Sequence, residues 1–170
     1  MKSFTKILFC VGVILLAYGY LCRILHIYFF WDSKELGWIV LFITLLFYLI
    51  DLHKSRKRQK KKTIWVKIGI GFLLFGLIIF PVVLSEIKKS ASYQAAIEYI
   101  KADTQIKNLV GNIKGFGLIP TGQSQSITVN RTESGDAIFN ITVKGDKKYK
   151  DLTVWLKKTP EADWTVISIN

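Results

Sequence analysis

The sequence predicts a membrane protein in which three transmembrane α-helices are followed by a small extracytoplasmic α+β domain, a helix packed on an antiparallel β-meander. Three observations lead to this fold class. Residues 1–85 contain three long apolar stretches, and a strongly basic run separates the second from the third. Beyond residue 85 the apolar residues first recur at helical spacing and then alternate along the chain. We therefore expect a membrane domain over residues 1–85 and an extracytoplasmic domain over residues 86–170.

The first apolar stretch covers about residues 7–30 and can cross a hydrocarbon core of about 30 Å as a tilted helix. Lys2 and Lys6 precede or open it and favour a cytoplasmic N-terminus. A cleaved signal peptide is the alternative, since Ala17-Tyr18-Gly19 is a passable cleavage site. The apolar stretch continues well past that site, and this favours an uncleaved transmembrane helix.

Two ionisable residues, Arg23 and His26, lie near the outer end of this stretch. Both can extend toward the headgroups beside the aromatic residues 28–31, an arrangement that is common at membrane interfaces. They can instead form a buried polar site between helices, because ionisable residues inside a membrane often mark function. The spacing favours the first interpretation. Cys10 and Cys22 lie in the same stretch and are expected to be inert packing residues.

The second and third apolar stretches cover about residues 36–52 and 64–84. The link before the second stretch, residues 32–35, is short and net negative, which suits a loop outside the cytoplasm. Lys67 lies near the inner end of the third stretch and can reach the cytoplasmic face. Three glycines in this stretch either let a neighbouring helix approach closely or reflect the general frequency of small residues in membrane helices. They are Gly69, Gly71 and Gly76.

A basic run lies in the predicted loop over residues 53–63, between the second and third stretches. Its seven positive charges are Lys54, Arg56, Lys57, Arg58, Lys60, Lys61 and Lys62. Short loops as basic as this one are retained in the cytoplasm, so the run predicts that the C-terminal half lies outside it. The run is either an orientation signal alone or also a binding site for anionic lipid headgroups. Nucleic acid is not an expected partner, because the loop is tied to the membrane at both ends.

The extracytoplasmic domain begins with a predicted helix over residues 86–110, which contains neither glycine nor proline. Apolar side chains recur there at helical spacing and form one stripe. Asp103-Thr104 is expected to divide the helix into a long and a short part, and Gly111 is expected to end it. The stripe supplies the apolar surface that one face of a sheet requires.

Beyond Gly111 the pattern changes to a period of two, which predicts an antiparallel meander of four strands. The expected strands are residues 126–132, 137–143, 152–156 and 164–169. The connecting turns are expected at residues 133–136, 145–148 and 159–163. Consecutive strands with short turns and one covering helix make a small α+β domain.

No catalytic set of residues is evident in the extracytoplasmic half. Residues 86–170 contain no histidine and no cysteine, and most of their carboxylates fall in predicted turns. Gly115-Phe116-Gly117 lacks the Lys-Ser/Thr pair of a phosphate-binding loop and opens no periodic helix. The net charge is +9 over residues 1–85 but only +3 over residues 86–170, which is poor evidence for nucleic-acid binding. We therefore expect a binding or assembly module without cofactor or metal, rather than an enzyme.

The order of several short motifs resembles the cytochrome c oxidase assembly factor 1 family over about residues 92–169. The motifs are Tyr93-Gln94-Ala95-Ala96, Ile100, Leu109-Val110-Gly111, Ile113, Gly122, Gly135-Asp136-Ala137, Val143-Lys144-Gly145 and Trp164. The resemblance implies a membrane-tethered domain on the outer side of the membrane, similar in fold to a small subunit of the mitochondrial presequence translocase. The residues expected to carry the family's structure are Gly111, Gly122, Gly135, Val143, Gly145 and Trp164.

The resemblance further implies a non-enzymatic protein that helps to assemble a terminal oxidase near its haem-copper subunit. The chain departs from the mitochondrial members in having three predicted spans where those have one. We therefore expect a multi-pass protein of a bacterial inner membrane, an assembly or accessory factor. Its expected partners are membrane lipids and other membrane proteins, with respiratory oxidase subunits among the candidates. The alternatives are an accessory subunit of another membrane complex, such as a transporter or secretion system, and a sensor domain that binds a small ligand.

Overall fold

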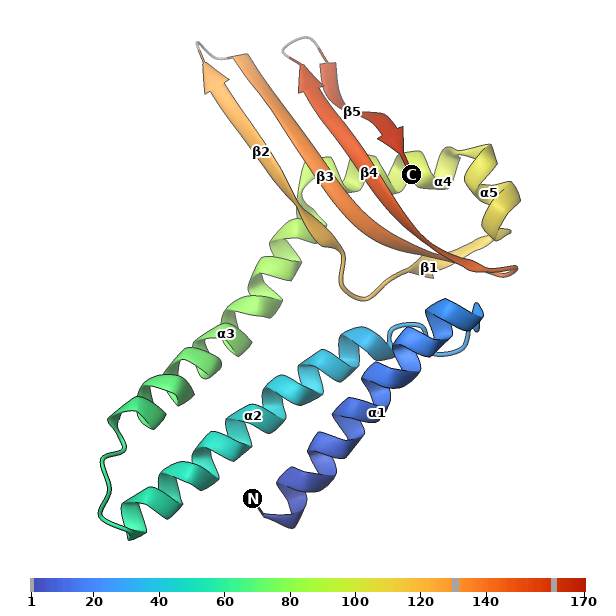
Figure 1. The fold of residues 1–170 in the computed structure, drawn as a ribbon. Helices are drawn as coiled ribbons and strands as arrows, with labels where there is room; N and C mark the ends of the chain where they lie inside the picture. Colours follow the sequence, from blue (N-terminus) through green and yellow to red (C-terminus); the bar gives the residue numbers. More distant parts are fainter. Residues whose placement is uncertain (1, 130–131, 160–161) are drawn as a thin grey trace. The chain divides into compact units, whose positions relative to one another are not determined.

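The computed structural model describes residues 2–129, 132–159 and 162–170. The chain forms two compact units, Met1–Val82 and Val83–Asn170. Long apolar helices make up the first unit, and two shorter helices with an antiparallel sheet make up most of the second (Figure 1). The prediction of three membrane-compatible helices followed by a helix and an antiparallel sheet is therefore confirmed.

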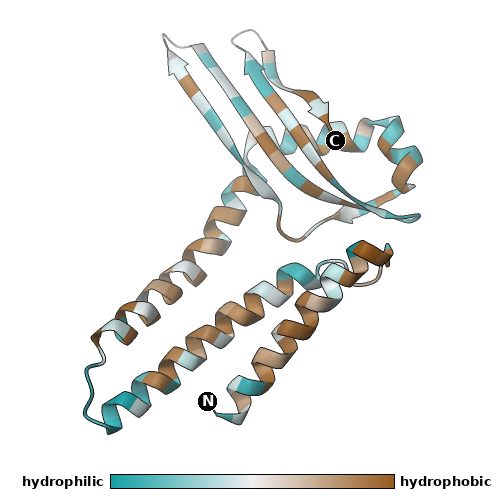
Figure 2. Cartoon of the chain, viewed as in Figure 1, coloured by the Kyte–Doolittle hydropathy of each residue, from teal (hydrophilic) through white to brown (hydrophobic). Residues whose placement is uncertain are grey.

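Three helices in the described part of the chain are long and apolar enough to cross a membrane. They are α1 (Ser3–Leu25), α2 (Ser33–Arg58) and α3 (Ile64–Lys89). Figure 2 shows them as predominantly hydrophobic along their length, with hydrophilic residues at the connection between α2 and α3. Large apolar side chains such as Trp65 and Phe72 of α3 are 78% and 76% exposed. Helices with this much exposed apolar surface require lipid or protein around them.

The ends of two helices differ from the expected ranges. α1 ends at Leu25 rather than near residue 30, because His26 adopts a left-handed conformation with φ 54° and caps the helix. α2 continues to Arg58 rather than ending at residue 52, so the first four basic residues of the run are helical. Lysine and arginine are good helix formers, and their charges interact favourably with the carbonyl end of a helix.

Helices α1 and α2 pack against each other at glycines. A Cβ atom on Gly19 of α1 would lie 2.5 Å from the backbone nitrogen of Lys34, and one on Gly37 of α2 would lie 2.9 Å from the backbone nitrogen of Leu16. Contacts this short leave no space for a side chain. The two backbones therefore approach closely, as they do at the small-residue interfaces of membrane helices.

The glycines of α3 make much looser contacts. A Cβ atom on Gly71 or Gly76 would have no neighbour within 4 Å in the described part of the chain, and one on Gly69 would meet only Leu49, at 3.2 Å. Within the first unit, the close helix approach proposed for α3 is thus found instead between α1 and α2. Hydropathy alone cannot distinguish these helices, because each contains at least one glycine in an apolar background.

Two shorter helices of the second unit follow α3. They are α4 (Ala91–Ala102) and α5 (Thr104–Val110). The Ser90 hydroxyl caps α4 by accepting a hydrogen bond from the backbone N–H of Tyr93 at 3.3 Å. The Asp103 carboxylate caps α5, accepting from the backbone N–H groups two and three residues on, at 2.7 and 3.0 Å. The break predicted at Asp103 is confirmed, whereas a helix start at residue 86 is wrong, because α3 continues to Lys89.

The sheet contains five antiparallel strands in the described part of the chain. They are β1 (Ile113–Phe116), β2 (Thr121–Val129), β3 (Thr132–Gly145), β4 (Tyr149–Thr159) and β5 (Ala162–Ile169). On one side of the long β3, β1 pairs with its end and β2 with its start. On the other side β4 pairs with β3, and β5 lies beyond β4 (Figure 1). Strands β2 to β5 form the predicted meander, and β1 is an additional strand.

The turn predicted at residues 133–136 is wrong. These residues belong to β3, where Gly135 pairs with Ser126 of β2 and with Lys158 of β4. Pairing with a strand on each side stabilises the extended conformation more than the local preference of Ser-Gly-Asp for a turn opposes it. Residues 130–131 of the first predicted strand and residues 160–161 of the last predicted turn lie outside the described residues.

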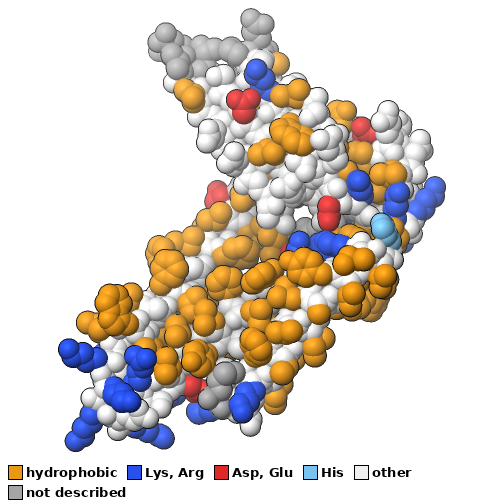
Figure 3. Space-filling view, in the orientation of Figure 1, with side chains coloured by type: hydrophobic (Ala, Val, Ile, Leu, Met, Phe, Trp, Pro, Cys, Tyr) orange, Lys and Arg blue, Asp and Glu red, His pale blue; other side chains and the backbone are white. Residues whose placement is uncertain are grey.

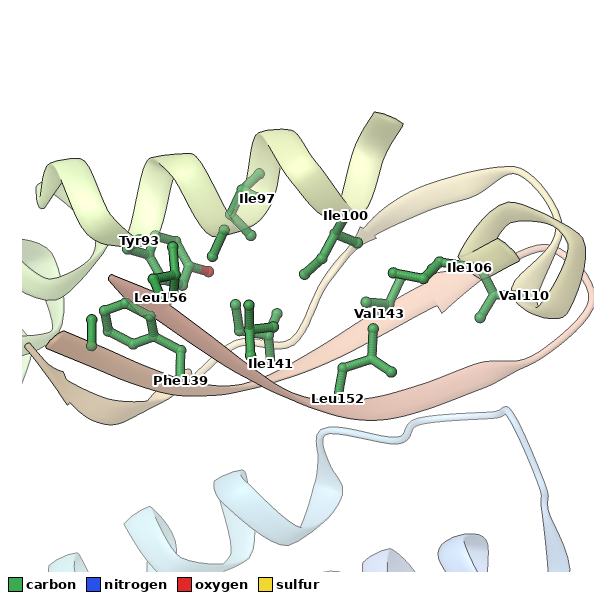
Figure 4. Packing of buried hydrophobic residues seen from close by; sticks show 13 residues of the cluster. Tyr93, Ile97, Ile100, Ile106, Val110, Phe139, Ile141, Val143, Leu152 and Leu156 are labelled. Atoms are coloured by element: carbon green, nitrogen blue, oxygen red, sulfur yellow. The ribbon is translucent and has the colours of Figure 1, made fainter. Parts of the chain in front are cut away.

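The core of the second unit lies between the helices and one face of the sheet, as Figure 4 shows. Its buried apolar residues are Tyr93, Ala96, Ile97, Ile100, Ile106, Val110, Ala137, Phe139, Ile141, Val143, Leu152, Val154 and Leu156. Every second residue of β3 and β4 contributes to it, as the period of two predicts. The rings of Tyr93 and Phe139 meet edge to face with centroids 5.5 Å apart. Each large apolar side chain buried here contributes about 1.5–3 kcal/mol.

Candidate functional site

Two of the expected structural residues, Gly111 and Gly145, meet where α5 ends against the β3–β4 turn. Gly111 has φ 82°, a conformation that side-chain-bearing residues rarely adopt. A Cβ atom on Gly145 would overlap with the carbonyl oxygen of Val110 and lie 2.6 Å from its carbonyl carbon. The backbone N–H of Lys147 donates to the same carbonyl oxygen at 3.0 Å. The two glycines therefore let the helix end and the turn pack backbone to backbone.

Asp146 fastens the same junction. Its Oδ1 accepts a hydrogen bond from the backbone N–H of Asn112 at 2.9 Å, and its Oδ2 accepts one from Asn112 Nδ2 at 3.0 Å. The hydrogen bond from the Asn112 side chain, helped by the one from its backbone, holds the pKa of the Asp146 carboxyl below its ordinary value. Because both oxygens are engaged in joining two segments, this carboxylate has a structural role.

The remaining expected residues also contribute to packing. Val143 is fully buried in the core. Gly135 of β3 leaves space for Trp164 of β5, since a Cβ atom on this glycine would lie 3.0 Å from Trp164 Cη2. A Cβ atom on Gly122 of β2 would lie 2.8 Å from the Cα of Phe139. The structure thus brings together Gly111 with Gly145, and Gly135 with Trp164, in two packing contacts of the scaffold.

The sheet face opposite the core is largely polar. Asn140 of β3 accepts a hydrogen bond from Thr153 Oγ1 of β4 at 2.7 Å and donates through Nδ2 to Thr121 Oγ1 of β2 at 3.4 Å. Ile138 and Trp155 are paired on this face and are half-buried. Cross-strand contacts of this kind stabilise a sheet. The backbone groups with unused hydrogen-bonding capacity lie at the edges of the sheet.

Strand β2 forms a regular and uncharged edge. Within the described part of the chain it pairs with β3 alone, in an unbroken register from Thr121↔Asn140 to Val129↔Thr132. The side chains of residues 121–128 are exposed, and the strand contains no charged residue and no proline. Natural edge strands usually carry charges, prolines or bulges that prevent pairing with another chain. β5, at the opposite edge, is interrupted by register shifts against β4.

A polar cluster lies between α1 and α2. Arg23 Nη2 lies 3.1 Å from Glu35 Oε1, and the two side chains are 17% and 18% exposed. Arg23 Nη1 donates to the carbonyl oxygens of Gly19 and Trp31, both at 3.2 Å. The side chain of Arg23 therefore takes part in a polar cluster between the two helices. Within the described residues, Ser33 Oγ and Glu35 Oε2 are buried without a hydrogen-bond partner.

The basic run divides into two groups. Lys54 and Arg58, on the last turns of α2, line a hollow of about 410 Å³, which we call the basic hollow. All the residues that line it are Lys2, Asp51, Lys54, Ser55, Arg58 and Gln59. Arg56 and Lys57 lie on the same turns outside the hollow, and Lys60, Lys61 and Lys62 follow in the connection to α3. Figure 3 shows lysine and arginine side chains gathered at this end of the helices.

The sequence did not predict the other residues of the basic hollow or the first half of the β2 edge, although it predicted a strand from residue 126. Residues 51, 54, 55 and 58 have the spacing of one helix face, a signal that becomes informative once the helix is known to continue past residue 52. Residues 121–125 include no apolar side chain, so no alternation of apolar residues marks them as a strand. Their extended conformation comes from pairing with β3.

The described residues contain no group of three or more histidine, cysteine, aspartate and glutamate side chains that could hold a metal ion. Among the titratable groups of the second unit, burial raises the pKa of the Tyr93 hydroxyl, so this core phenol stays neutral. The pKa of Glu133 is lowered, first by the hydrogen bond from Lys158 Nζ at 2.7 Å. Comparisons of the chain with protein-family models, with curated proteins and with solved structures found no match.

Proposed function

We propose that this protein is a non-enzymatic, membrane-anchored assembly or accessory factor, which binds partner proteins through its C-terminal unit outside the cytoplasm. The observation that carries the proposal is the β2 edge. It is exposed, uncharged and free of bulges, and it pairs on one side only within the described residues. An edge with none of the usual protection is an aggregation hazard unless another chain covers it.

The mode of binding that fits this edge is the addition of a strand. An extended segment of the partner lies beside β2, and the backbone N–H and C=O groups of both strands supply the hydrogen bonds. Specificity comes from the alternate side chains. Those that β2 presents on the open face include Gln123 and Gln125, both exposed. The edge therefore suits a partner segment with polar side chains at the matching positions.

The anchoring of the unit limits which partners it meets. Ser90 alone separates α3 from α4, so a single residue joins a membrane-compatible helix to the first helix of the fold that carries β2. With the orientation that the basic run predicts, this fold stands outside the cytoplasm. Extended segments of neighbouring membrane proteins, as they emerge from the bilayer, are the partners within reach.

Subunits of a respiratory cytochrome oxidase are the partners to test first, because the motif order in the C-terminal half resembles that of an oxidase assembly family. An accessory role in another membrane complex would use the same edge and differ only in the partner. In the described part of the C-terminal unit, apolar side chains from α4 and the sheet pack together where the pocket of the ligand-sensor alternative would be, which favours protein binding (Figure 4).

The proposal is tested by gentle detergent purification of the tagged full-length protein, followed by mass spectrometry of co-purifying proteins. Gln123→Lys with Gln125→Lys places two charges on the β2 edge. Gln105→Lys with Asn108→Lys places the same two charges on exposed positions of α5 and is the matched control. We expect the β2 variant to recover at least tenfold less partner than the wild type, and the α5 variant to recover an unchanged amount.

Recovery of haem-copper oxidase subunits by the wild type, lost with the β2 variant, would support the narrower proposal. Recovery of a different membrane complex with the same dependence on β2 would reject the oxidase and retain the accessory role. A protein recovered alone, or partners lost equally with both variants, would contradict binding through the β2 edge.

A further inference from the structure

The basic hollow exists because α2 extends beyond the start of α1. Asp51 of α2 contacts the first residues of α1: its Oδ2 accepts a hydrogen bond from Thr5 Oγ1 at 3.3 Å and from the backbone N–H of Lys2 at 3.4 Å. α1 begins at Ser3, whereas α2 continues to Arg58, about 10 Å further along the helix at 1.5 Å per residue. The face of α2 that carries Asp51 therefore continues past the point where α1 can cover it.

The uncovered face carries several residues with hydrogen-bond donors in a wall that is otherwise largely apolar. Lys54, Ser55 and Arg58 follow Asp51 at intervals of one helical face, and Lys2 joins them from the start of α1. Residues with ammonium, guanidinium and hydroxyl groups thus contribute to the wall of an open hollow of about 410 Å³, and Gln59 also lines it. This volume has room for a phosphate group with several oxygen atoms exposed to donors.

The charges in the hollow do not balance. Asp51 is already engaged by α1, and its Oδ1 lies 3.8 Å from Lys2 Nζ. In the part of the chain that the structure describes, Lys54 and Arg58 form no ion pair with a carboxylate. They are also like charges four residues apart on one helix, an arrangement that destabilises the helix unless an anion lies between them. Arginine is well suited to that anion if it is a phosphate, because its guanidinium can bind two oxygens at once.

Next to the hollow, toward the middle of the helices α1 and α2, lies apolar surface. Phe4 of α1 and Phe47 of α2, one turn further along, meet edge to face with ring centroids 5.5 Å apart and are 58% and 39% exposed. A free phosphate ion would use only the donors. A phospholipid would use both parts, its phosphate in the hollow and its acyl chains along the aromatic side chains.

We propose that the basic hollow is a binding site for an anionic phospholipid, which it recognises by the phosphodiester group. The ligand is held by Lys54, Arg58 and Lys2, with Ser55 and Gln59 as uncharged donors. This site lies where apolar helices meet a basic segment, the level at which headgroups lie in a bilayer. The inference is independent of the partner that the C-terminal unit binds.

The test uses the full-length protein in detergent and counts bound lipid by native mass spectrometry after incubation with phosphatidylglycerol or, separately, zwitterionic phosphatidylcholine. Lys54→Gln with Arg58→Gln removes two charges from the hollow. Lys60→Gln with Lys61→Gln removes two charges outside it and is the matched control. We expect the hollow variant to weaken phosphatidylglycerol binding by roughly tenfold to thirtyfold, and the control variant by less than twofold.

Retention of phosphatidylglycerol by Lys54→Arg with Arg58→Lys, with unchanged helical circular dichroism in every variant, would support a site that depends on charge and position. Equal losses in the hollow and control variants would overturn the proposal in favour of diffuse attraction to the whole run. Equal binding of both lipids by the wild type would overturn it too. Displacement of the lipid by millimolar inorganic phosphate would assign the hollow to a soluble phosphate ligand instead.

Discussion

Asp146 and Asn112 show how single residues of the second unit join distant parts of the chain. They lie 34 positions apart, and their two hydrogen bonds connect the end of α5 to the turn between β3 and β4. Gly111 precedes Asn112 and Gly145 precedes Asp146 in the chain. Because these glycines have no side chains, the two backbones can approach closely. The hydrogen bonds and the glycines therefore both hold the end of α5 against the turn.

The lowered pKa of Asp146 makes this junction sensitive to acid. A carboxyl whose pKa is lower in the folded than in the unfolded chain contributes stability above its unfolded value, about 3.9 for aspartate. That contribution is lost as the pH falls through the lower folded value. We expect Asp146→Asn to lower the denaturation midpoint of the full-length protein at pH 6, and the difference from the wild type to shrink steadily below about pH 4.

The measurement is a series of urea denaturation curves from pH 6 to pH 2.5, followed by tryptophan fluorescence. Asn112→Ala is the informative companion, because the Asn112 side chain is the largest cause of the lowered pKa. That variant should lose part of the pH dependence while it keeps the carboxylate. A difference between Asp146→Asn and the wild type that stays constant over the whole range would contradict the assignment.

At the scale of secondary-structure elements, the hairpin of α1 and α2 is the tightest association in the first unit. A Cβ atom added to Gly19 would lie 2.5 Å from the backbone nitrogen of Lys34. The backbone cannot move aside as a flexible side chain can. We expect Gly19→Ala to destabilise the hairpin by about 1–3 kcal/mol, the usual cost of overpacking. Gly71→Ala of α3 is the matched control, and it should be neutral or stabilising by up to about 1 kcal/mol, since alanine is the better helix former.

Thermal denaturation of the full-length variants in one detergent, followed by helical circular dichroism, distinguishes the two sites. A lower midpoint for Gly19→Ala together with an unchanged or higher one for Gly71→Ala is the expected result. If both variants melt at the wild-type temperature, the close contact between α1 and α2 is not a determinant of stability in that detergent. If Gly71→Ala alone is destabilised, α3 has a packing partner at that position.

An element is predictable from the sequence when the interactions that form it are local in the chain, and is not when they join distant segments. Hydropathy predicts the three long helices, and the Asp103 cap predicts the break between α4 and α5, because both signals are local. The strand character of residues 133–136 cannot be read locally, since it depends on pairing with β2 and, from Gly135 onward, also with β4. The basic hollow is also non-local, because Lys2 precedes α1 whereas Asp51 lies on α2. The sequence shows the positive charge of the basic run. It does not show which of these residues line the basic hollow and which lie outside it.

At the scale of the whole molecule, charge and hydropathy together predict the orientation of the chain in the membrane. The basic segment between α2 and α3 is the strongest asymmetry in the chain, with seven lysine and arginine residues between Lys54 and Lys62. Three crossings by the membrane-compatible helices would place the residues before α1 and the residues after α3 on opposite sides. The excess of positive charge then predicts that the N-terminus and the basic segment lie in the cytoplasm and that the sheet lies outside it. This orientation decides on which side of the membrane the protein partner and the lipid headgroup lie. The two binding experiments do not depend on it.

Accessibility to a membrane-impermeant maleimide tests the orientation in intact bacterial cells that express the protein. Gln59→Cys places a thiol next to the basic hollow, and Gln123→Cys places one on the exposed β2 edge. We expect Gln123→Cys to be labelled in intact cells after the outer permeability barrier is opened, and Gln59→Cys only after the inner membrane is disrupted as well. The wild-type chain is the blank, since Cys10 and Cys22 lie within α1, where a polar reagent has little access. The reverse pattern would place the sheet in the cytoplasm and would contradict a partner outside it. Labelling of both positions from the same side would mean that α3 does not cross the membrane.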